Sequence, residues 1–420
     1  MRVLLVTAGE PLPFDRADIR LHRTGQFAAW LVAQGHEVDW VTNRFDHFRR
    51  IHRAESGVAM LHQNYRIHLL ESRGYQATIG PSRMRDHVDL GRAFLDRTRE
   101  FGRPDVVVAA MPTIELAAVS VAWAKQVGAT SLVDIRDLWP DIMVERAPAA
   151  IRWMARLALS RLFRTVREAL RNADGIIALN PAFLDWGLDH AHRAMRQQDS
   201  VIPLGYELRP VSENDLGSAM QFWSERGLAL HYGAPPILAF AGSVSSVADF
   251  TPVLDASKRL AARGVRTVVC GVGARLEELR RVAPEYPGLL LAGWCSYPQI
   301  RVLLEHATVG LLPYRDSVNY RNHLPNKAGE YLAHGLPIAW SLGTGPLARI
   351  IAERDVGFSY GNDGATLAEA VDELLGSPTR MAACRAASRA LFEAEFDAAA
   401  IHQRMFDHLT LVTSLRAGVT

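Results

Sequence analysis

The chain has 420 residues, of which 49% are hydrophobic and 22% charged, and its formal net charge at pH 7 is +2. One hydrophobic core seldom serves a chain of this length, so we expect two domains of roughly 200 residues each. The composition excludes a disordered chain, and the small net charge gives no indication of a nucleic-acid partner.

Cysteines and hydrophobic runs bear on the location of the protein. The three cysteines, Cys270, Cys295 and Cys384, are odd in number and lack metal-ligand spacing, so we expect neither a disulfide framework nor a zinc site. This pattern fits a reducing, cytoplasmic setting. The first apolar run is too short for a secretion signal, and Pro112 and Glu115 interrupt the longest one. We therefore expect no secretion signal and no membrane-spanning segment.

Strand and helix patterns alternate from the first residues onward. Hydrophobic, β-branched runs begin at Arg2, Glu37, Asp105 and Ser131, and helical patterns cover about 23–34 and 115–126. Gly35 follows the first helical pattern and is a typical helix stop. Such alternation is typical of a parallel sheet covered by helices on both faces.

The same pattern starts again after a polar stretch at 207–233. Strand-like runs lie at 236–242, 267–273, 289–294 and 307–314, with helical patterns at about 252–263 and 276–282. We place a first Rossmann-like domain at 1–205 and a second at 206–397. The final helix, about 398–420, has an apolar side, and we expect it to pack back on the first domain.

Ligands of open α/β sheets gather beyond the carboxyl ends of the strands, so the loops there are candidate sites. In the loop 7–23, Gly9 allows close backbone approach, while Arg16, Arg20 and Arg23 can meet an anionic group. A solvated basic helix start is the alternative.

Another such loop is DIRDLWPD at 134–141, directly after a predicted buried strand. Arg136 and Asp137 are candidate functional residues there. The alternative is a structural ion pair between these two side chains.

The segment AFAGSVSS opens the second domain. The backbone amides of Gly242 and Ser243 have room to face a phosphate there, although the motif is weak. The nearby GVGARL lacks the third glycine of a dinucleotide fingerprint, so we do not assign it that role.

The most informative segment is NHLPNKAGEYLAHGLPIAW at 322–340. Pro325 can start a helix with Asn326 and Lys327 in its first turn and Glu330 one turn later on the same face. A lysine at a helix N-terminus suits a diphosphate, and a carboxylate can accept two hydrogen bonds from a ribose. An ordinary surface pair of Lys327 and Glu330 is the alternative.

This segment, in order after GHEV, DIRDLWPD, ADGIIALN and VVCGVG, resembles the retaining GT-B glycosyltransferases, which include bacterial transferases for capsule and O-antigen. The resemblance implies two Rossmann-like domains facing a cleft, with a nucleotide-sugar donor on the C-terminal one. Glu330 matches the second glutamate of the family's E-x7-E motif, which is expected to bind the ribose, whereas Asn322 replaces the first. The usual Arg and Lys pair is missing from GSVSSVADF, so Lys327 is expected to compensate the diphosphate charge.

LPNKAGEY and DIRDLWP are similar to a subgroup of amino-sugar transferases in surface-polysaccharide assembly. The resemblance implies transfer of a hexosyl or N-acetylhexosaminyl group with the leaving phosphate as proton acceptor, and without a cofactor or metal ion. In that mechanism Lys327, with the amides of Gly242 and Ser243, stabilises the diphosphate, while Arg136 and Asp137 orient the acceptor.

Residues 151–171 read as one basic amphipathic helix. It can lie on an anionic membrane near a lipid-linked acceptor, which the family's polyprenyl-diphosphate acceptors favour, or pack on its own sheet. Two rival functions also stay open, namely a nucleotide-sugar 2-epimerase and a non-catalytic relative that binds sugar nucleotides.

Overall fold

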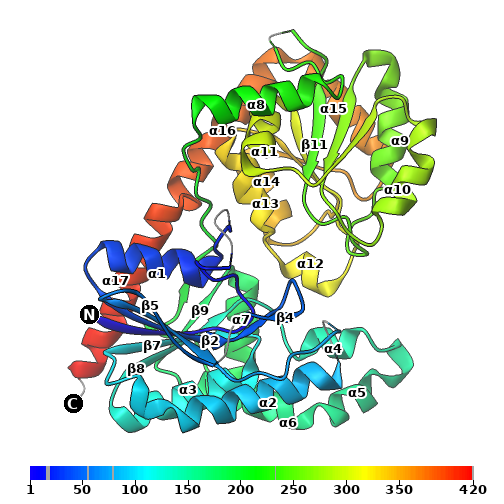
Figure 1. Cartoon of the computed structure of the whole chain (residues 1–420). Helices are drawn as coiled ribbons and strands as arrows, with labels where there is room; N and C mark the ends of the chain where they lie inside the picture. Colours follow the sequence, from blue (N-terminus) through cyan, green and yellow to red (C-terminus); the bar gives the residue numbers. More distant parts are fainter. Residues whose placement is uncertain (16–18, 54–55, 78–79, 232, 419–420) are drawn as a thin grey trace. The chain divides into compact units, whose positions relative to one another are not determined.

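The computed structural model describes residues 1–15, 19–53, 56–77, 80–231 and 233–418. The chain divides into two compact units, the first made of Met1–Leu204 with Ile401–Thr420 and the second of Gly205–Ala400. Each unit is a sheet covered by helices on both faces, which confirms the two doubly wound α/β domains (Figure 1).

The described part of the first unit holds an eight-stranded sheet in the order β10-β9-β8-β7-β1-β2-β6-β5. Its strands are parallel from β10 to β6, and β5 pairs antiparallel with β6 at the edge. The strands are β1 (Arg2–Val6), β2 (Glu37–Asn43), β5 (Gly57–His62), β6 (Tyr65–Leu70), β7 (Val106–Met111), β8 (Thr130–Ile135), β9 (Gly175–Ala178) and β10 (Ser200–Val201). A short antiparallel pair, β3 (Phe45–Asp46) and β4 (Ile51–His52), follows β2.

Two hydrophobic cores sandwich this sheet. On one face, α1 (Arg23–Ala33) and α17 (Ala398–Ala417) pack through residues that include Phe27, Leu31 and Leu409. The other face is covered by α2 (Pro81–Asp96), α3 (Ile114–Val127), α6 (Ser160–Asn172) and α7 (Pro181–Ala191). The shorter helices of the unit are η1 (Thr98–Glu100), α4 (Asp141–Glu145), η2 (Ala149–Ile151) and α5 (Arg152–Ala158).

The second unit holds a parallel sheet in the order β13-β12-β11-β14-β15-β16. Its strands are β11 (Ile237–Ala241), β12 (Arg266–Cys270), β13 (Leu289–Gly293), β14 (Val309–Leu312), β15 (Ile338–Trp340) and β16 (Gly357–Ser359). After β11 the chain adds β12 and then β13 on one side of it. It then returns and adds β14, β15 and β16 on the other side of β11. The strand order therefore reverses between β11 and β14, where open sheets of this kind bind ligands.

Helices cover both faces of the second sheet as well (Figure 1). One face carries α9 (Thr251–Leu260), η3 (Ala261–Arg263), α10 (Leu276–Val282), η4 (Ala283–Glu285) and α15 (Gly364–Gly376). The other carries α8 (Glu213–Ser224), α11 (Tyr297–His306), α13 (Asn326–Ala333), α14 (Pro346–Arg354) and α16 (Pro378–Glu395), and α12 (Val318–Asn322) precedes α13. α8 lies within the stretch that was expected only to be polar. The Ser212 side chain, which accepts a hydrogen bond from the Asp215 backbone, caps its start.

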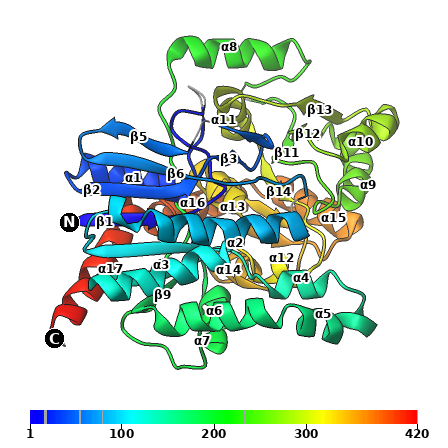
Figure 2. The same cartoon turned by 60° about the horizontal axis from the view of Figure 1, so that its bottom comes forward.

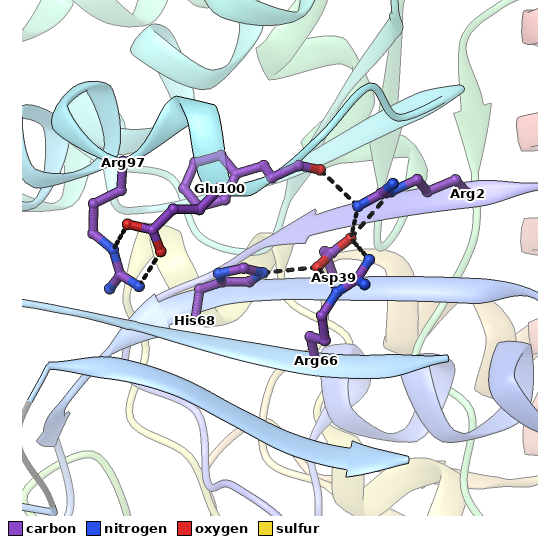
Figure 3. Close-up of polar contacts among 7 residues, drawn as sticks. Arg2, Asp39, Arg66, His68, Arg97 and Glu100 are labelled. Atoms are coloured by element: carbon purple, nitrogen blue, oxygen red, sulfur yellow. Dashed lines mark hydrogen bonds and ion pairs between the residues drawn. The ribbon is translucent and has the colours of Figure 1, made fainter. Parts of the chain in front are cut away.

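A buried carboxylate ties β1, β2 and β6 together near their amino ends, away from the ligand loops (Figure 3). Asp39 accepts hydrogen bonds from Arg66 at 2.7 and 2.8 Å and from Arg2 at 3.0 Å, and lies 2.7 Å from His68 Nε2. Burial alone would raise the pKa of Asp39, but the hydrogen bonds from Arg66 and His68 outweigh it and hold the pKa well below its usual range. A carboxylate with a lowered pKa stabilises the fold above its unfolded pKa and loses that effect as the pH falls through the folded value.

Candidate active site

The strongest predicted site lies in the second unit, at the carboxyl ends of β11 and β14. α13 begins at Asn326 with Pro325 as its N-cap, as the sequence predicts. In its first turn the Ala328 amide donates to the Pro325 carbonyl at 2.8 Å. The positive end of a helix dipole, together with first-turn amides, makes such a turn suitable for an anion. Asn326 is exposed and Lys327 is half-buried.

Lys327 lies directly against Gly242, the first residue after β11. A Cβ placed on Gly242 would overlap Lys327 Cε and Nζ, so only glycine leaves room for this lysine. The Nζ atom stands 5.8 Å from the centre of the Phe240 ring. The structure therefore brings together two of the predicted donor-binding residues, which are 85 positions apart in the chain.

The amide of Gly242 does not face a ligand, which corrects its predicted role. It donates to the Cys270 carbonyl at 2.8 Å, and Gly271 in turn donates to the Gly293 carbonyl at 2.6 Å. Moreover, α9 begins only at Thr251, so no helix dipole stands behind this loop. Gly242 serves by its missing side chain, and exposed Ser243 is the residue whose amide still fits the prediction.

Gly271 explains the glycines of the segment GVGARL. Its φ is +148°, and a Cβ there would overlap the Gly242 carbonyl oxygen. Gly273, with φ +156°, meets the Val244 carbonyl in the same way. These two glycines thus allow the loop after β12 to pack on the loop after β11, a role that the fingerprint comparison could not reveal.

Glu330 is buried on α13, one turn after Lys327, and a hydrogen bond from Tyr206 orients its side chain. The Tyr206 hydroxyl donates to Glu330 Oε1 at 3.2 Å. Next to it, Tyr331 OH lies 3.1 Å from the Leu311 carbonyl, and its ring fills the space that a Cβ on Gly310 would need. Tyr331 is therefore an aromatic anchor that fixes α13 on the sheet, beside the buried Glu330 carboxylate.

Asn322, which replaces the first glutamate of the E-x7-E motif, is the last residue of α12, and His323 follows it on the way to α13. Both are half-buried, and burial lowers the pKa of His323 to about 4. His323 is therefore a neutral imidazole at pH 7.

Two apolar side chains at this edge were not predicted. Val272 and Trp294 follow β12 and β13, and they are 53% and 64% exposed. An exposed tryptophan at the carboxyl end of a strand is the signal that could have found them, since a planar apolar surface suits a nucleobase.

In the first unit, the predicted Arg136 takes part in a buried ion cluster. It pairs with Asp134 at 2.8 Å and with Glu10, but not with Asp137 as the alternative reading supposed. Glu10 also accepts hydrogen bonds from the Thr24 hydroxyl and backbone. Burial alone would lower the pKa of Arg136, but Asp134 and Glu10 outweigh it and raise the pKa. Arg136 thus fixes the carboxyl ends of β1 and β8 together.

Arg23 belongs to the same cluster and is buried, which contradicts the alternative of a solvated basic helix start for this residue. Its side chain is 5% exposed, and it contacts Asp134 at 3.0 Å and donates to the Pro203 carbonyl at 2.7 Å. Arg20 is exposed, and Arg16 lies outside the described residues. Gly9 has a φ of +83°, and its amide donates to Asn43 Oδ1 at 3.0 Å.

Asp137 has contacts other than those of this cluster. It accepts a hydrogen bond from the Leu138 backbone at 3.0 Å, and burial raises its pKa. One of the charges that face it is Arg83 of α2, a residue that the sequence did not single out.

The predicted single helix at 151–171 is in fact two helices. α5 and α6 meet at Leu159, and α5 extends beyond α6 in both views (Figures 1 and 2). α6 buries its apolar side, including Leu162 and Val166, as in the cytosolic alternative. α5 has no buried residue, and its Trp153 and Leu157 are 67% and 68% exposed.

Two features are absent from the described residues. No helix there is long and apolar enough to cross a membrane. Likewise, the described side chains contain no group of three or more His, Cys, Asp or Glu that could hold a metal ion.

Comparisons with known proteins agree with this architecture. A model described as a glycosyl transferase 4-like domain matches residues 22–205, and one described as glycosyl transferases group 1 matches residues 235–377. A search of curated proteins finds no match.

Solved structures resemble the chain over nearly its whole length. Sucrose-phosphate synthase from Thermosynechococcus elongatus is 18% identical, with a TM-score of 0.67 and 99% of both chains covered. HepE from Anabaena, in complex with UDP-glucose, is 15% identical, with a TM-score of 0.63, covering 98% of this chain and 99% of that one. WaaG, a glycosyltransferase involved in lipopolysaccharide biosynthesis, is 14% identical, with a TM-score of 0.63, covering 98% of this chain and all of the other.

At these identities the structural likeness shows the fold, which is GT-B. The two family models are both glycosyl transferase models, with the 4-like domain matching most of the first unit and the group 1 domain matching most of the second.

Proposed function

We propose that the second unit binds a nucleotide-diphosphate sugar, and that the enzyme transfers the sugar to an acceptor with retention of the anomeric configuration. The observation that carries this proposal is the contact between Lys327 and Gly242 at the reversal point of the sheet, with Glu330 one turn further along α13. Lys327 and Glu330 follow one another along α13 in the order in which a sugar nucleotide would present its diphosphate and its ribose.

The diphosphate would lie at the first turn of α13. The amides of Asn326 and Lys327, with the Lys327 ammonium, would stabilise the negative charge that builds up as the glycosidic bond breaks. Glu330, held by Tyr206, would accept hydrogen bonds from the ribose hydroxyls. The exposed Trp294 and Val272 would then contact the base.

The printed descriptions of similar structures support this choice of donor. HepE from Anabaena has been solved in complex with UDP, with UDP and glucose, and with UDP-glucose. We propose that the present chain likewise takes a nucleoside-diphosphate hexose or N-acetylhexosamine.

The chemical step needs no nucleophile from the protein. The leaving phosphate would accept the acceptor's proton on the same face of the sugar, so the protein's part is to stabilise the diphosphate and to orient the acceptor. Lys327 carries the first role. Arg136 acts as a positioning residue through its ion cluster, and Asp137 stays a candidate for contact with the acceptor.

A panel of sugar nucleotides tests the proposal, because a ligand that binds only the folded state raises the apparent melting temperature. We expect a shift with one nucleotide class, lost in Lys327→Ala and Glu330→Gln. Transfer assays then separate the rivals. A rearranged sugar nucleotide formed without acceptor would indicate a 2-epimerase, and donor binding without any turnover a non-catalytic relative. NMR of the product's anomeric proton checks retention, and an inverted product would contradict the mechanism.

We further propose that the enzyme works at the cytoplasmic face of a membrane, on a lipid-linked acceptor of surface polysaccharide or glycolipid assembly. The support is α5, whose exposed Trp153, Met154 and Leu157 follow exposed Ile151. Exposed arginines of α5, including Arg152, lie among them. Exposed apolar groups among cations suit an anionic lipid surface.

Vesicle sedimentation tests this attachment. We expect the chain to bind phosphatidylglycerol vesicles more tightly than phosphatidylcholine vesicles, and a variant with Trp153→Ser and Leu157→Ser to lose most of that binding. Met60→Ser and Met195→Ser form the matched control, since both side chains are about as exposed elsewhere in the first unit. Equal binding to neutral vesicles, or by the α5 variant, would contradict the attachment.

A further inference from the structure

Two arginines gather with histidine and aromatic side chains at the carboxyl edge of the first sheet, apart from the ion cluster of Arg136. This group consists of Arg50, Arg83, His47, His87, Tyr75 and Trp139, and we call it the arginine-aromatic cluster. His47 and Arg50 follow β2, Tyr75 follows β6, Trp139 follows β8, and Arg83 and His87 belong to α2. Gly9, after β1, lies against His47, since a Cβ there would stand 3.6 Å from His47 Cβ.

Both guanidinium groups of this cluster are held by aromatic rings. Arg83 Cζ lies 5.2 Å from the centre of the Tyr75 ring and 4.6 Å from that of Trp139. Arg50 Cζ lies 5.2 Å from the Tyr75 ring. Both rings are buried, at 6% and 4% exposure, so they fix the cations in place. Ring contacts use the faces of a guanidinium, whereas its five N–H groups point outward in its plane.

The histidines of the cluster act as neutral acceptors. His47 Nδ1 lies 2.8 Å from Tyr75 OH and 3.3 Å from Arg50 Nη1, and Arg83 Nε donates to His87 Nε2 at 3.3 Å. Burial, then Arg83 and Arg50, lower the pKa of His47 to about 4. Burial, then Arg83 and His47, lower that of His87 to about 3. Neither histidine adds a charge at pH 7.

Four carboxylates lie near the cluster. Glu115 Oε2 stands 3.9 Å from His87 Nδ1, and the other three have other donors. Asp46 accepts from the backbone of Phe48 and Arg49. Asp86 accepts from the Ser72 hydroxyl and the Gly74 amide. The third is Asp137, whose pKa is raised by burial, and this shift reduces its tendency to carry charge. Because Asp46 and Asp86 already accept hydrogen bonds from other groups, they compete less with an incoming anion for Arg50 and Arg83.

We propose that Arg50 and Arg83 bind a phosphate or diphosphate group of the acceptor at the carboxyl edge of the first sheet. Two guanidinium groups beside one phenol can together donate hydrogen bonds to the several oxygens of such a group. A single carboxylate has fewer oxygens and would engage fewer of these donors. This inference rests on the proposed function only in calling the ligand an acceptor. The anion site itself is argued from residues of the first unit alone.

Calorimetric titration with inorganic diphosphate tests the site in the whole chain. We expect two independent sites in the wild type, because Lys327 provides one and the arginine-aromatic cluster the other. Lys327→Ala should remove the first site only. Arg83→Gln and Arg50→Gln should each weaken the second roughly 10- to 100-fold, as expected when one charged hydrogen-bond donor is lost.

Matched controls exist beside each arginine. Arg49 and Arg85 are exposed neighbours in sequence, and Arg49→Gln and Arg85→Gln should leave both sites unchanged. If Arg83→Gln fails to fold, Arg50→Gln decides alone, since Arg50 lies in the turn between β3 and β4. A single site that disappears with Lys327→Ala, or equal weakening by the control variants, would overturn the inference.

The source of the phosphate is tested with farnesyl diphosphate and farnesol as probes. Binding of the diphosphate that depends on Arg50, with none for the alcohol, supports phosphate recognition in a lipid-linked acceptor. If farnesyl diphosphate binds no more tightly than inorganic diphosphate, the site recognises the phosphate without its lipid, which supports the anion site but contradicts a lipid-linked acceptor as its source. If sugar nucleotides fail to bind while the second site persists, the proposed function fails and this site does not.

Discussion

Gly242→Ala separates the catalytic role of Lys327 from the stability of the fold. The three heavy atoms nearest to the added Cβ all belong to the Lys327 side chain. Carbon atoms in contact stand about 3.5–4 Å apart, so the end of the lysine must move by more than about 1 Å. A misplacement of about 1 Å at a reacting centre can cost about 100-fold in rate. We therefore expect kcat/KM to fall about 100-fold.

The same substitution should leave the fold intact. Gly242 does not have a positive φ, and alanine in an ordinary backbone conformation restricts the unfolded chain. The free energy of unfolding should therefore stay level or rise by about 0.4–1 kcal/mol. Thermal unfolding and transfer kinetics on the same preparation measure both quantities. Gly217→Ala in α8 is the control, because no atom lies within 4 Å of its Cβ, and its kcat/KM should match the wild type.

A double-mutant cycle with Lys327→Ala completes the test. If Gly242 acts only through the lysine, then Gly242→Ala should have no further effect on kcat/KM once the lysine is gone. Effects that add in the double variant would refute this reasoning, as would a Gly242→Ala enzyme with full activity.

Three further outcomes follow from contacts described above. Gly271→Ala should lower the free energy of unfolding by about 1–3 kcal/mol in urea, because its Cβ meets backbone at a positive φ; unchanged stability would contradict the packing of the two loops. Glu330→Gln should weaken donor binding roughly 10- to 100-fold by calorimetry, and Tyr206→Phe less, whereas equal effects would point to a structural role for Glu330. Asp39→Asn should lower the free energy of unfolding by about 3 kcal/mol at pH 7, measured by urea titration. This difference from the wild type should shrink as the pH falls below about 4, and a difference independent of pH would count against the lowered pKa of Asp39.

Local patterns predicted the elements that are long or strongly apolar. The strands β1, β2, β7, β8 and β11 to β14 lie within or close to the predicted hydrophobic runs, and Gly35 ends the first helix as expected, with a φ of +83°. The strands β15 and β16 have three residues each, too few for a periodic signal. α8 was missed because its polar composition hides the buried Trp223.

Prediction of the site failed where partners are distant in sequence. The start of α13 follows from Pro325 and local spacing, so Asn326, Lys327 and Glu330 were found. The Arg136 side chain instead pairs with Glu10, 126 positions away, and the Gly242 amide is used by Cys270 on the next strand. Such pairings are set by how strands and loops pack, and no local spacing encodes them.

The last helix has a consequence for how the protein is made. Ile401, Met405, Leu409 and Val412 complete a core whose other members include Val3, Leu5 and Phe27. The whole second unit, Gly205–Ala400, is therefore translated before the first unit receives its final core residues. While about 200 further residues are synthesised, one apolar face of the first unit's sheet stays partly uncovered. Apolar surface exposed in this way is a binding site for chaperones.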